Sequence, residues 1–246
     1  MGVVVLEFPG EKARWGIIEV LAVLVLVFGV GITYGFWGPQ LFAYLVYHGW
    51  LSGTLVSEFI LGYLVQFVIT VGAVFIFALL VRKNSIQALG LTGLSPRNFL
   101  NWGVGGGILL FIAILAAGVL MERLIPELPP QSFELVLQSV VSFQEFVILL
   151  LVVSVIAPFA EELYFRGFVY PVFRNRMGVV AGALLSGLFF GLAHWDPWRA
   201  VPLALAGVVL ALIYEKSKSI YTCWAAHGLW NGAMGLIFYF TFYHPW

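Results

Sequence analysis

A small set of ionisable and amide side chains interrupts the apolar second half of the chain. Its members are Glu161, Glu162, Arg166, His194, His227 and Asn231. A carboxylate and an imidazole can hold a water molecule and take its proton. An amide, or an imidazole in the donor tautomer, can direct an N–H group at a developing negative charge. If these groups meet in one place, they suit hydrolysis by an activated water molecule.

The two carboxylates lie in the run APFAEELYFRG. Because side chains four residues apart share one face of a helix, Glu162 and Arg166 are predicted to be neighbours, and Glu161 is turned away from them. Arg166 then neutralises Glu162, whereas Glu161 stays free to hold or release a proton. Two adjacent carboxylates do not both ionise easily in a low dielectric, so one of them is suited to act as a general base. Pro158 is expected to bend this helix.

The remaining polar residues fall on two further helices. His194 ends the run FFGLAH, and His227 and Asn231 lie four residues apart, so they share one helix face. If the chain turns near Asn175, Glu161 lies roughly 21 Å and His194 roughly 28 Å from that turn. His227 and Asn231 lie roughly 14 and 20 Å from the last inner loop. If the helices tilt, all four residues reach a similar depth in the membrane, although His194 lies somewhat farther from the inner side than the others.

Each of these residues also has a purely structural interpretation. A single histidine in a membrane helix often hydrogen-bonds a neighbouring helix, and a Glu–Arg pair is often a clamp. Three polar clusters on three late helices favour function, because the first half of the chain has few polar groups. Glu19, Glu58 and Gln66 are scattered there and receive no common role. Asp196 and Arg199 are interpreted as a local ion pair.

The composition places these helices in a membrane. Of the 246 residues, 62% are hydrophobic and 10% are charged, and the mean hydropathy is +1.01. Soluble domains carry about 25% charged residues, so a bilayer is the better solvent for this chain. The net charge is zero, and no basic run indicates nucleic acid as a partner. The single cysteine, Cys223, excludes an internal disulfide and is interpreted as a small buried apolar residue.

Seven stretches are predicted to span the membrane. They are residues 20–37, 59–81, 98–121, 146–160, 177–195, 200–214 and 219–246. Residues 41–52 are too short to cross alone and are interpreted as a re-entrant or interfacial piece in preference to an eighth span. An N-terminus in the cytoplasm places 10 of the 12 Lys and Arg residues on the inner side, as the positive-inside rule requires.

The sequence therefore predicts an all-α, polytopic transmembrane helix bundle. Residues 1–144 are expected to supply the N-terminal transmembrane helices and residues 145–246 the catalytic core, within one integral membrane domain. The expected location is a prokaryotic cell membrane. The expected partners are the lipid bilayer and a membrane-associated peptide or protein.

The three polar clusters resemble the signature of the CAAX-protease and bacteriocin-processing family, also called CPBP or Abi. That signature has the parts EExxxR, FxxxH and HxxxN, which read here as Glu161-Glu162-x-x-x-Arg166, Phe190-x-x-x-His194 and His227-x-x-x-Asn231. All three parts occur in order, each in an apolar helix, over about residues 145–235. The N-terminal spans match the family only in being hydrophobic.

The resemblance implies the core fold of the type II CAAX prenyl endopeptidases and a glutamate-dependent intramembrane peptidase. It implies that Glu161 and His194 activate a water molecule. It also implies that His227 and Asn231 stabilise the oxyanion of the tetrahedral intermediate. The other two residues of the first motif then support the site.

The same side chains leave the choice of a metal open. Two histidines and a glutamate can ligate zinc and leave the fourth position free, and the family has been described both with and without a metal. We favour metal-free activation of water because Asn231 fits an oxyanion donor better than a zinc ligand.

Three functions compete at this level. The favoured one is an endopeptidase that cleaves a membrane-associated or lipid-modified peptide, such as a prenylated tail, a bacteriocin leader or a sorting segment. A non-catalytic immunity or scaffolding protein on the same fold is the alternative, because a fold does not fix a function. A transporter or proton channel needs a polar relay across the whole bilayer, and the early spans offer little beyond Glu58 and Gln66.

Overall fold

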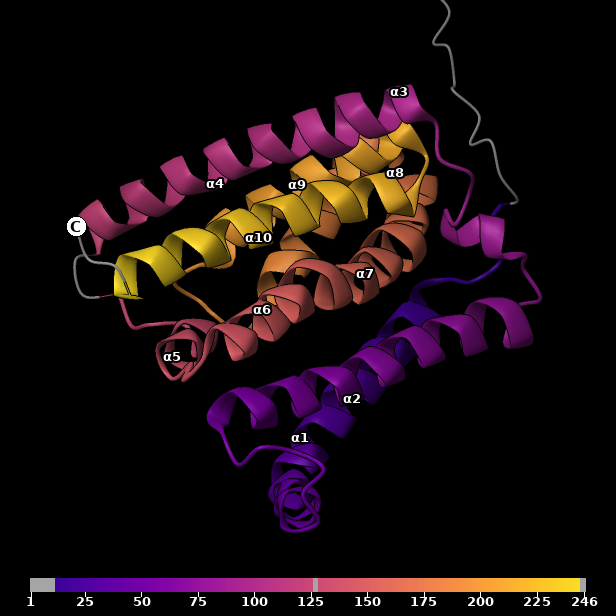
Figure 1. Cartoon of the computed structure of the whole chain (residues 1–246). Coiled ribbons are helices and arrows are strands. Elements are labelled where there is room, and N and C mark those ends of the chain that lie inside the picture. The colour runs from indigo at the N-terminus through magenta and orange to yellow at the C-terminus, as the bar shows by residue number, and fades with distance from the viewer. Residues whose placement is uncertain (1–11, 126–127, 244–246) are drawn as a thin grey trace, which may run out of the picture.

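The computed structural model describes residues 12–125 and 128–243, and all regular elements in those ranges are helices (Figure 1). The prediction of an all-α protein is therefore confirmed. The α-helices are α1 (Ile17–Tyr47), α2 (Leu55–Phe75), α3 (Pro96–Asn98), α4 (Gly105–Leu124), α5 (Ser132–Gln138), α6 (Phe143–Leu151), α7 (Ala157–Glu162), α8 (Tyr170–Ala193), α9 (Ala200–Ser217) and α10 (Ile220–Tyr243). Shorter 3-10 and π segments are η1 (Ile76–Val81), η2 (Ile86–Leu89), η3 (Phe99–Val104), η4 (Val152–Ile156) and η5 (Leu163–Val169).

The first helix is longer than the sequence analysis predicts. α1 is one helix of 31 residues that includes residues 41–47, and a turn then leads to α2. The expectation of a separate re-entrant piece at 41–52 is therefore wrong. A continuous helix satisfies its backbone hydrogen bonds internally, which an isolated irregular piece facing lipid cannot do.

The helical run from Phe143 to Ala193 folds back on itself at Gly178. Gly178 has φ 80° and ψ −177°, a backbone conformation that is essentially restricted to glycine. A Cβ atom added to Gly182 would lie 2.8 Å from the Cα atom of Arg174, so the arms before and after the turn pack closely against each other. The run is therefore a helical hairpin.

Five helical segments of the described residues are long and apolar enough to cross a membrane. They are Ile17–Tyr47, Leu55–Val81, Pro96–Leu124, Phe143–Ala193 and Ala200–Ser217. The chain is thus a multi-pass membrane protein. The segment Phe143–Ala193 contains two of the predicted spans because it turns at Gly178. α10 is not among the five, so the count of seven crossings stays a prediction.

Basic side chains meet at one end of the bundle. The backbone N–H of Arg14 donates to Oδ1 of Asn84 over 3.1 Å, which joins the start of α1 to the loop after η1. Glu215 binds both Arg174, at 2.9 Å, and Lys218, at 2.6 Å. This end is the predicted cytoplasmic end, and the orientation of the chain across the membrane stays a prediction.

Two helices from the second half of the chain lie in the middle of the molecule. α6 and α7 lie between the α1–α2 pair and the layer that contains α4 and α10 (Figure 1). α8 and α9 pack closely because small glycine residues line their contact. A Cβ atom on Gly187 would lie 2.6 Å from the carbonyl oxygen of Ala204.

Candidate active site

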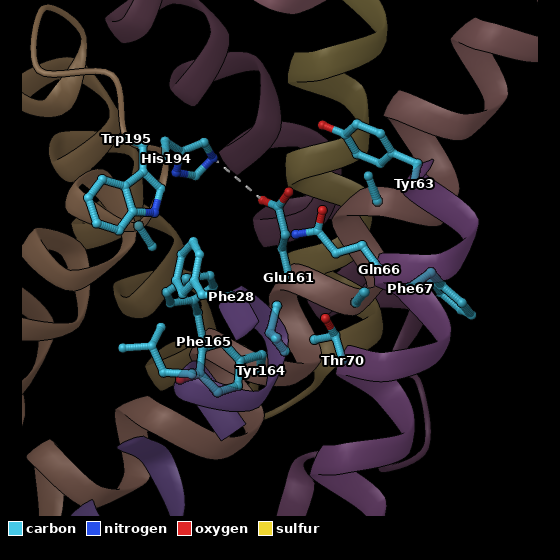
Figure 2. Close-up of a pocket in the computed structure, with 15 residues that line it drawn as sticks. Phe28, Tyr63, Gln66, Phe67, Thr70, Glu161, Tyr164, Phe165, His194 and Trp195 are labelled. Carbon is cyan, nitrogen blue, oxygen red and sulfur yellow. Dashed lines mark ion pairs between the residues drawn. The ribbon is translucent and has the colours of Figure 1, made fainter. Parts of the chain in front are cut away.

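The turn at Gly178 brings Glu161 and His194 to the same depth. Glu161 lies 17 residues before Gly178 and His194 lies 16 residues after it. At 1.5 Å per residue, the two arms measure about 25 and about 24 Å. The expected turn near Asn175 is therefore wrong, and this error explains why His194 seemed far out. In the structure, Nε2 of His194 lies 4.0 Å from Oε2 of Glu161 (Figure 2).

His227 of α10 faces the same carboxylate. Its Nε2 atom lies 3.8 Å from Oε2 of Glu161. Both separations exceed the 2.7–3.2 Å of a direct hydrogen bond, and a bridging water molecule fits between such groups. The structure thus brings a carboxylate and two imidazoles together from separate helices.

Each histidine makes a hydrogen bond through its other ring nitrogen, Nδ1, and this bond defines which nitrogen carries the proton. Nδ1 of His194 lies 2.7 Å from the carbonyl oxygen of Phe190, and Nδ1 of His227 lies 2.7 Å from Oε1 of Glu162. Because both oxygens only accept, each Nδ1 must donate. Each neutral imidazole therefore presents the lone pair of its Nε2 atom to Glu161.

Glu162 and Arg166 form the predicted ion pair, which is confirmed. Nη1 of Arg166 lies 2.9 Å from Oε1 of Glu162, and both side chains are 0% exposed. Arg166 also donates to the carbonyl oxygen of Gly207 over 3.1 Å and lies 4.6 Å from the ring centroid of Phe190. The pair therefore compensates two buried charges and holds the acceptor that orients His227.

The amide of Asn231 has a different partner. Its Nδ2 atom donates to the carbonyl oxygen of Val153 in η4 over 2.9 Å. This hydrogen bond ties α10 to the helix that carries Glu161. One of the two N–H groups of Asn231 is therefore unavailable as an oxyanion donor.

Two structural interpretations from the sequence are also confirmed. The side chain of Cys223 is fully buried, with Sγ 3.7 Å from the carbonyl oxygen of Leu210. Asp196 and Arg199 form a local ion pair at 3.0 Å. Neither feature belongs to the group of side chains around Glu161.

A cavity of about 310 Å³ adjoins Glu161 and His194 (Figure 2). One wall comes from α7, η5 and the end of α8. The opposite wall comes from α1 and α2, and it consists of Leu24, Val27, Phe28, Tyr63, Gln66, Phe67 and Thr70. A cavity that is largely apolar with a few convergent polar groups is typical of a ligand-binding site.

The wall from α2 contains residues that the sequence analysis missed. Gln66 is interpreted there as a scattered polar residue, but the structure places it with Tyr63 in the cavity of Glu161 (Figure 2). The available signal was their spacing of three residues on one helix face, within a stretch that lacks charges. The hydrophobicity of the early spans obscured it.

The donor atoms around Glu161 have the chemistry of a zinc site but not a suitable arrangement. Two Nε2 lone pairs and a carboxylate are typical zinc ligands, and hydrogen-bonded Nδ1 atoms are typical of metal-binding histidines. Within residues 12–125 and 128–243, however, no group of three His, Cys, Asp or Glu side chains is placed to hold a metal ion.

Fold and site together define a class: a multi-pass helical membrane protein in which a glutamate close to two histidines lines a cavity between helices. Residues 143–233 match the family model described as type II CAAX prenyl endopeptidase Rce1-like. This segment is thus Rce1-like, and the resemblance seen in the sequence is confirmed there. It contains all six candidate site residues, whereas the α1–α2 wall lies outside it.

Two curated relatives match about three fifths of the chain. One is an Escherichia coli protein named "Uncharacterized 24.3 kDa protein", 27% identical over 57% of this chain and 65% of its own length. The other is a Bacillus subtilis (strain 168) protein named "Putative membrane peptidase YdiL", 23% identical over 61% of this chain and 58% of its own length. The match thus spans less than two thirds of either relative. No solved structure matches the chain.

Proposed function

We propose that this protein is a CAAX-type intramembrane endopeptidase that hydrolyses a peptide bond in a membrane-associated or lipid-modified peptide. The observation that carries this proposal is the position of Glu161, with Nε2 atoms of two histidines at 4.0 and 3.8 Å, in the wall of an internal cavity. The Rce1-like segment supports the same class of enzyme.

In this mechanism a water molecule lies between Glu161 and Nε2 of His194. Its oxygen adds to the carbonyl carbon of the substrate while its proton passes to the Glu161 carboxylate. The tetrahedral intermediate then collapses, the C–N bond breaks, and the leaving nitrogen takes the proton back from Glu161. The products are one peptide with a new carboxylate and one with a new amine.

His227 is suited to the negative charge of the intermediate. The carboxylate of Glu162 accepts its Nδ1–H group over 2.7 Å and orients the ring. When Nε2 also carries a proton, it can donate a hydrogen bond to the oxyanion. The oxyanion role that the resemblance implies for Asn231 requires its second N–H group, because the first is bonded to Val153.

A non-catalytic scaffold explains the site less well. The buried Glu162–Arg166 pair alone would serve as a structural clamp. Glu161 instead has no direct hydrogen bond to either histidine, and 28% of its side chain is exposed beside the cavity. A carboxylate left open to water at membrane depth is costly and favours a functional role.

The test uses the full chain purified in detergent and a fluorogenic peptide that ends in a prenylated CAAX sequence. The same peptide without the prenyl group shows whether lipid modification is needed. Glu161→Gln keeps the size of the side chain but cannot accept the proton, so kcat is expected to fall about 10²- to 10⁴-fold. Glu58→Gln is the matched control, because Glu58 lies in the first turn of α2 outside the cavity.

Two results would overturn the proposal. One is undiminished cleavage by the Glu161→Gln variant in a protein that is still folded. The other is wild-type protein that cleaves neither peptide.

A further inference from the structure

The candidate site residues offer few spare hydrogen-bond donors in the resting state. Nδ1 of His194 and Nδ1 of His227 both donate away from Glu161, and Nδ2 of Asn231 donates to the backbone of η4. Among these residues, the second N–H group of Asn231 and the Nε2–H group of a protonated His227 are the donors left for the substrate. A tetrahedral intermediate usually needs two or more donors placed in advance.

The wall contributed by α2 holds donors that have no such partner. Tyr63 carries an O–H group and Gln66 two amide N–H groups. Within the described part of the chain, neither side chain makes a hydrogen bond. Figure 2 shows both side chains extending from α2 toward Glu161, with the carboxylate between them and His194.

The depth of Gln66 argues against a merely tolerated polar residue. It lies 11 residues after the start of the segment Leu55–Val81, near the middle of that 27-residue span. At 1.5 Å per residue, this is about 17 Å along the helix. A polar side chain at such a depth is costly unless it is paired or faces a hydrated cavity. Gln66 faces the cavity of Glu161.

We propose that Tyr63 and Gln66 are substrate-contacting catalytic residues: they donate hydrogen bonds to the carbonyl oxygen of the bond that is cleaved. This inference rests on the proposed peptidase function. It makes the active site a joint product of two parts of the chain. The base and the imidazoles come from the Rce1-like segment, whereas these donors come from α2, outside residues 143–233.

The charge that develops on the substrate explains why such donors accelerate the reaction. The carbonyl oxygen is weakly basic in the substrate and becomes an oxyanion when water adds to the carbon. Donors that are already in place bind the oxyanion more strongly than the ground-state carbonyl. They therefore raise kcat with little effect on KM, whereas a residue that only lines the cavity changes KM.

The test compares Tyr63→Phe and Gln66→Leu with wild type in the same cleavage assay of the prenylated peptide. Tyr63→Phe removes one hydroxyl and keeps the ring, and Gln66→Leu keeps a similar size in a helix that tolerates leucine. We expect each variant to lower kcat by about 10²-fold and to leave KM within about twofold. Tyr44→Phe, on the exposed end of α1, is the control and is expected to change neither constant.

Thermal unfolding of each purified variant separates a chemical effect from a folding defect. A loss of kcat in variants that unfold at the wild-type temperature supports the inference. Wild-type kcat in both variants, or an effect confined to KM, overturns it.

The outcome for Glu161→Gln keeps this inference distinct from the function on which it rests. If Glu161→Gln is inactive while both α2 variants match wild type, the inference alone is wrong. If Glu161→Gln is active, or wild type cleaves neither peptide, the proposed function fails and the inference fails with it.

Discussion

Some residues of the site face the cavity, and others orient the side chains of the site through hydrogen bonds and ion pairs. Glu161 and His194 face the cavity, whereas the buried Glu162–Arg166 pair lies behind His227. A buried carboxylate that accepts from an arginine and an imidazole sets the orientation and tautomer of that imidazole. Removing one member of a fully buried pair leaves the other charge without compensation.

Substitution of Glu162 is therefore predicted to destabilise the protein. Glu162→Gln leaves the guanidinium of Arg166 buried without a counter-charge, and we expect the free energy of unfolding to fall by about 3–5 kcal/mol. Glu58→Gln, in a partly exposed position, is expected to stay within about 0.5 kcal/mol of wild type. Denaturant unfolding in detergent measures both, and equal stability of the two variants contradicts the prediction.

The residues around Glu161 also predict the response to metal chelation. The proposed mechanism uses a carboxylate, imidazoles and hydrogen-bond donors, so treatment with EDTA or phenanthroline is expected to leave kcat unchanged. Metal analysis of the purified protein accompanies the assay. Activity that is lost on chelation and restored by zinc contradicts the metal-free mechanism, because two histidines and Glu161 have the chemistry of zinc ligands.

At the scale of elements, the helix that carries Glu161 is irregular on both sides of the site. π-helical η4 precedes α7 and π-helical η5 follows it, and such segments are frequent at functional sites. Pro158 lies between them, in the first turn of α7, where the sequence analysis expects a bend. α10 packs directly on η4, since a Cβ atom on Gly228 would overlap the carbonyl oxygen of Ser154.

A methyl group at this contact is predicted to displace α10. Gly228→Ala would push the neighbouring His227 away from Glu161, and we expect a loss of about 1–3 kcal/mol in stability together with lower kcat. Gly118→Ala in α4 is the matched control, because its Cβ atom would meet nothing within 4 Å. The helix propensity of alanine should stabilise that variant by up to about 1 kcal/mol. Equal behaviour of the two variants in unfolding and cleavage assays argues against this role of α10.

At the scale of the whole molecule, one cavity lies between the α1–α2 pair and the helices of the Rce1-like segment. Residues of α1 and α2 form the side of the cavity opposite α7 and η5. Basic residues gather at one end of both groups of helices, where Arg14 meets Asn84 and Glu215 meets Lys218. The positive-inside rule predicts that this end faces the cytoplasm.

Labelling of introduced cysteines tests that orientation. The native Cys223 is buried, so Cys223→Ala provides a background without a reactive thiol. Lys216→Cys lies at the basic end of α9, and Gln144→Cys lies at the opposite end, in the first turn of α6. We expect a membrane-impermeant maleimide to label only the Gln144→Cys variant in intact cells and both variants in broken cells. Labelling of the Lys216→Cys variant in intact cells reverses the predicted topology.

The sequence by itself determined that this is a multi-pass helical membrane protein and which polar side chains belong together on each helix. The low fraction of charged residues indicates a bilayer as solvent, and spacings of four residues predict which side chains share a helix face. These are local properties, so they identify the Glu162–Arg166 pair and the three polar clusters without any knowledge of packing.

Only the tertiary structure decided where the helices turn and which helices meet. The hairpin at Gly178 equalises the depths of Glu161 and His194, and a turn three residues away from the expected position changes that alignment by several ångströms. Gln66 reaches the same cavity from α2. Contacts between helices that are distant in sequence depend on how side chains pack, and the periodicity of a single helix does not contain that information.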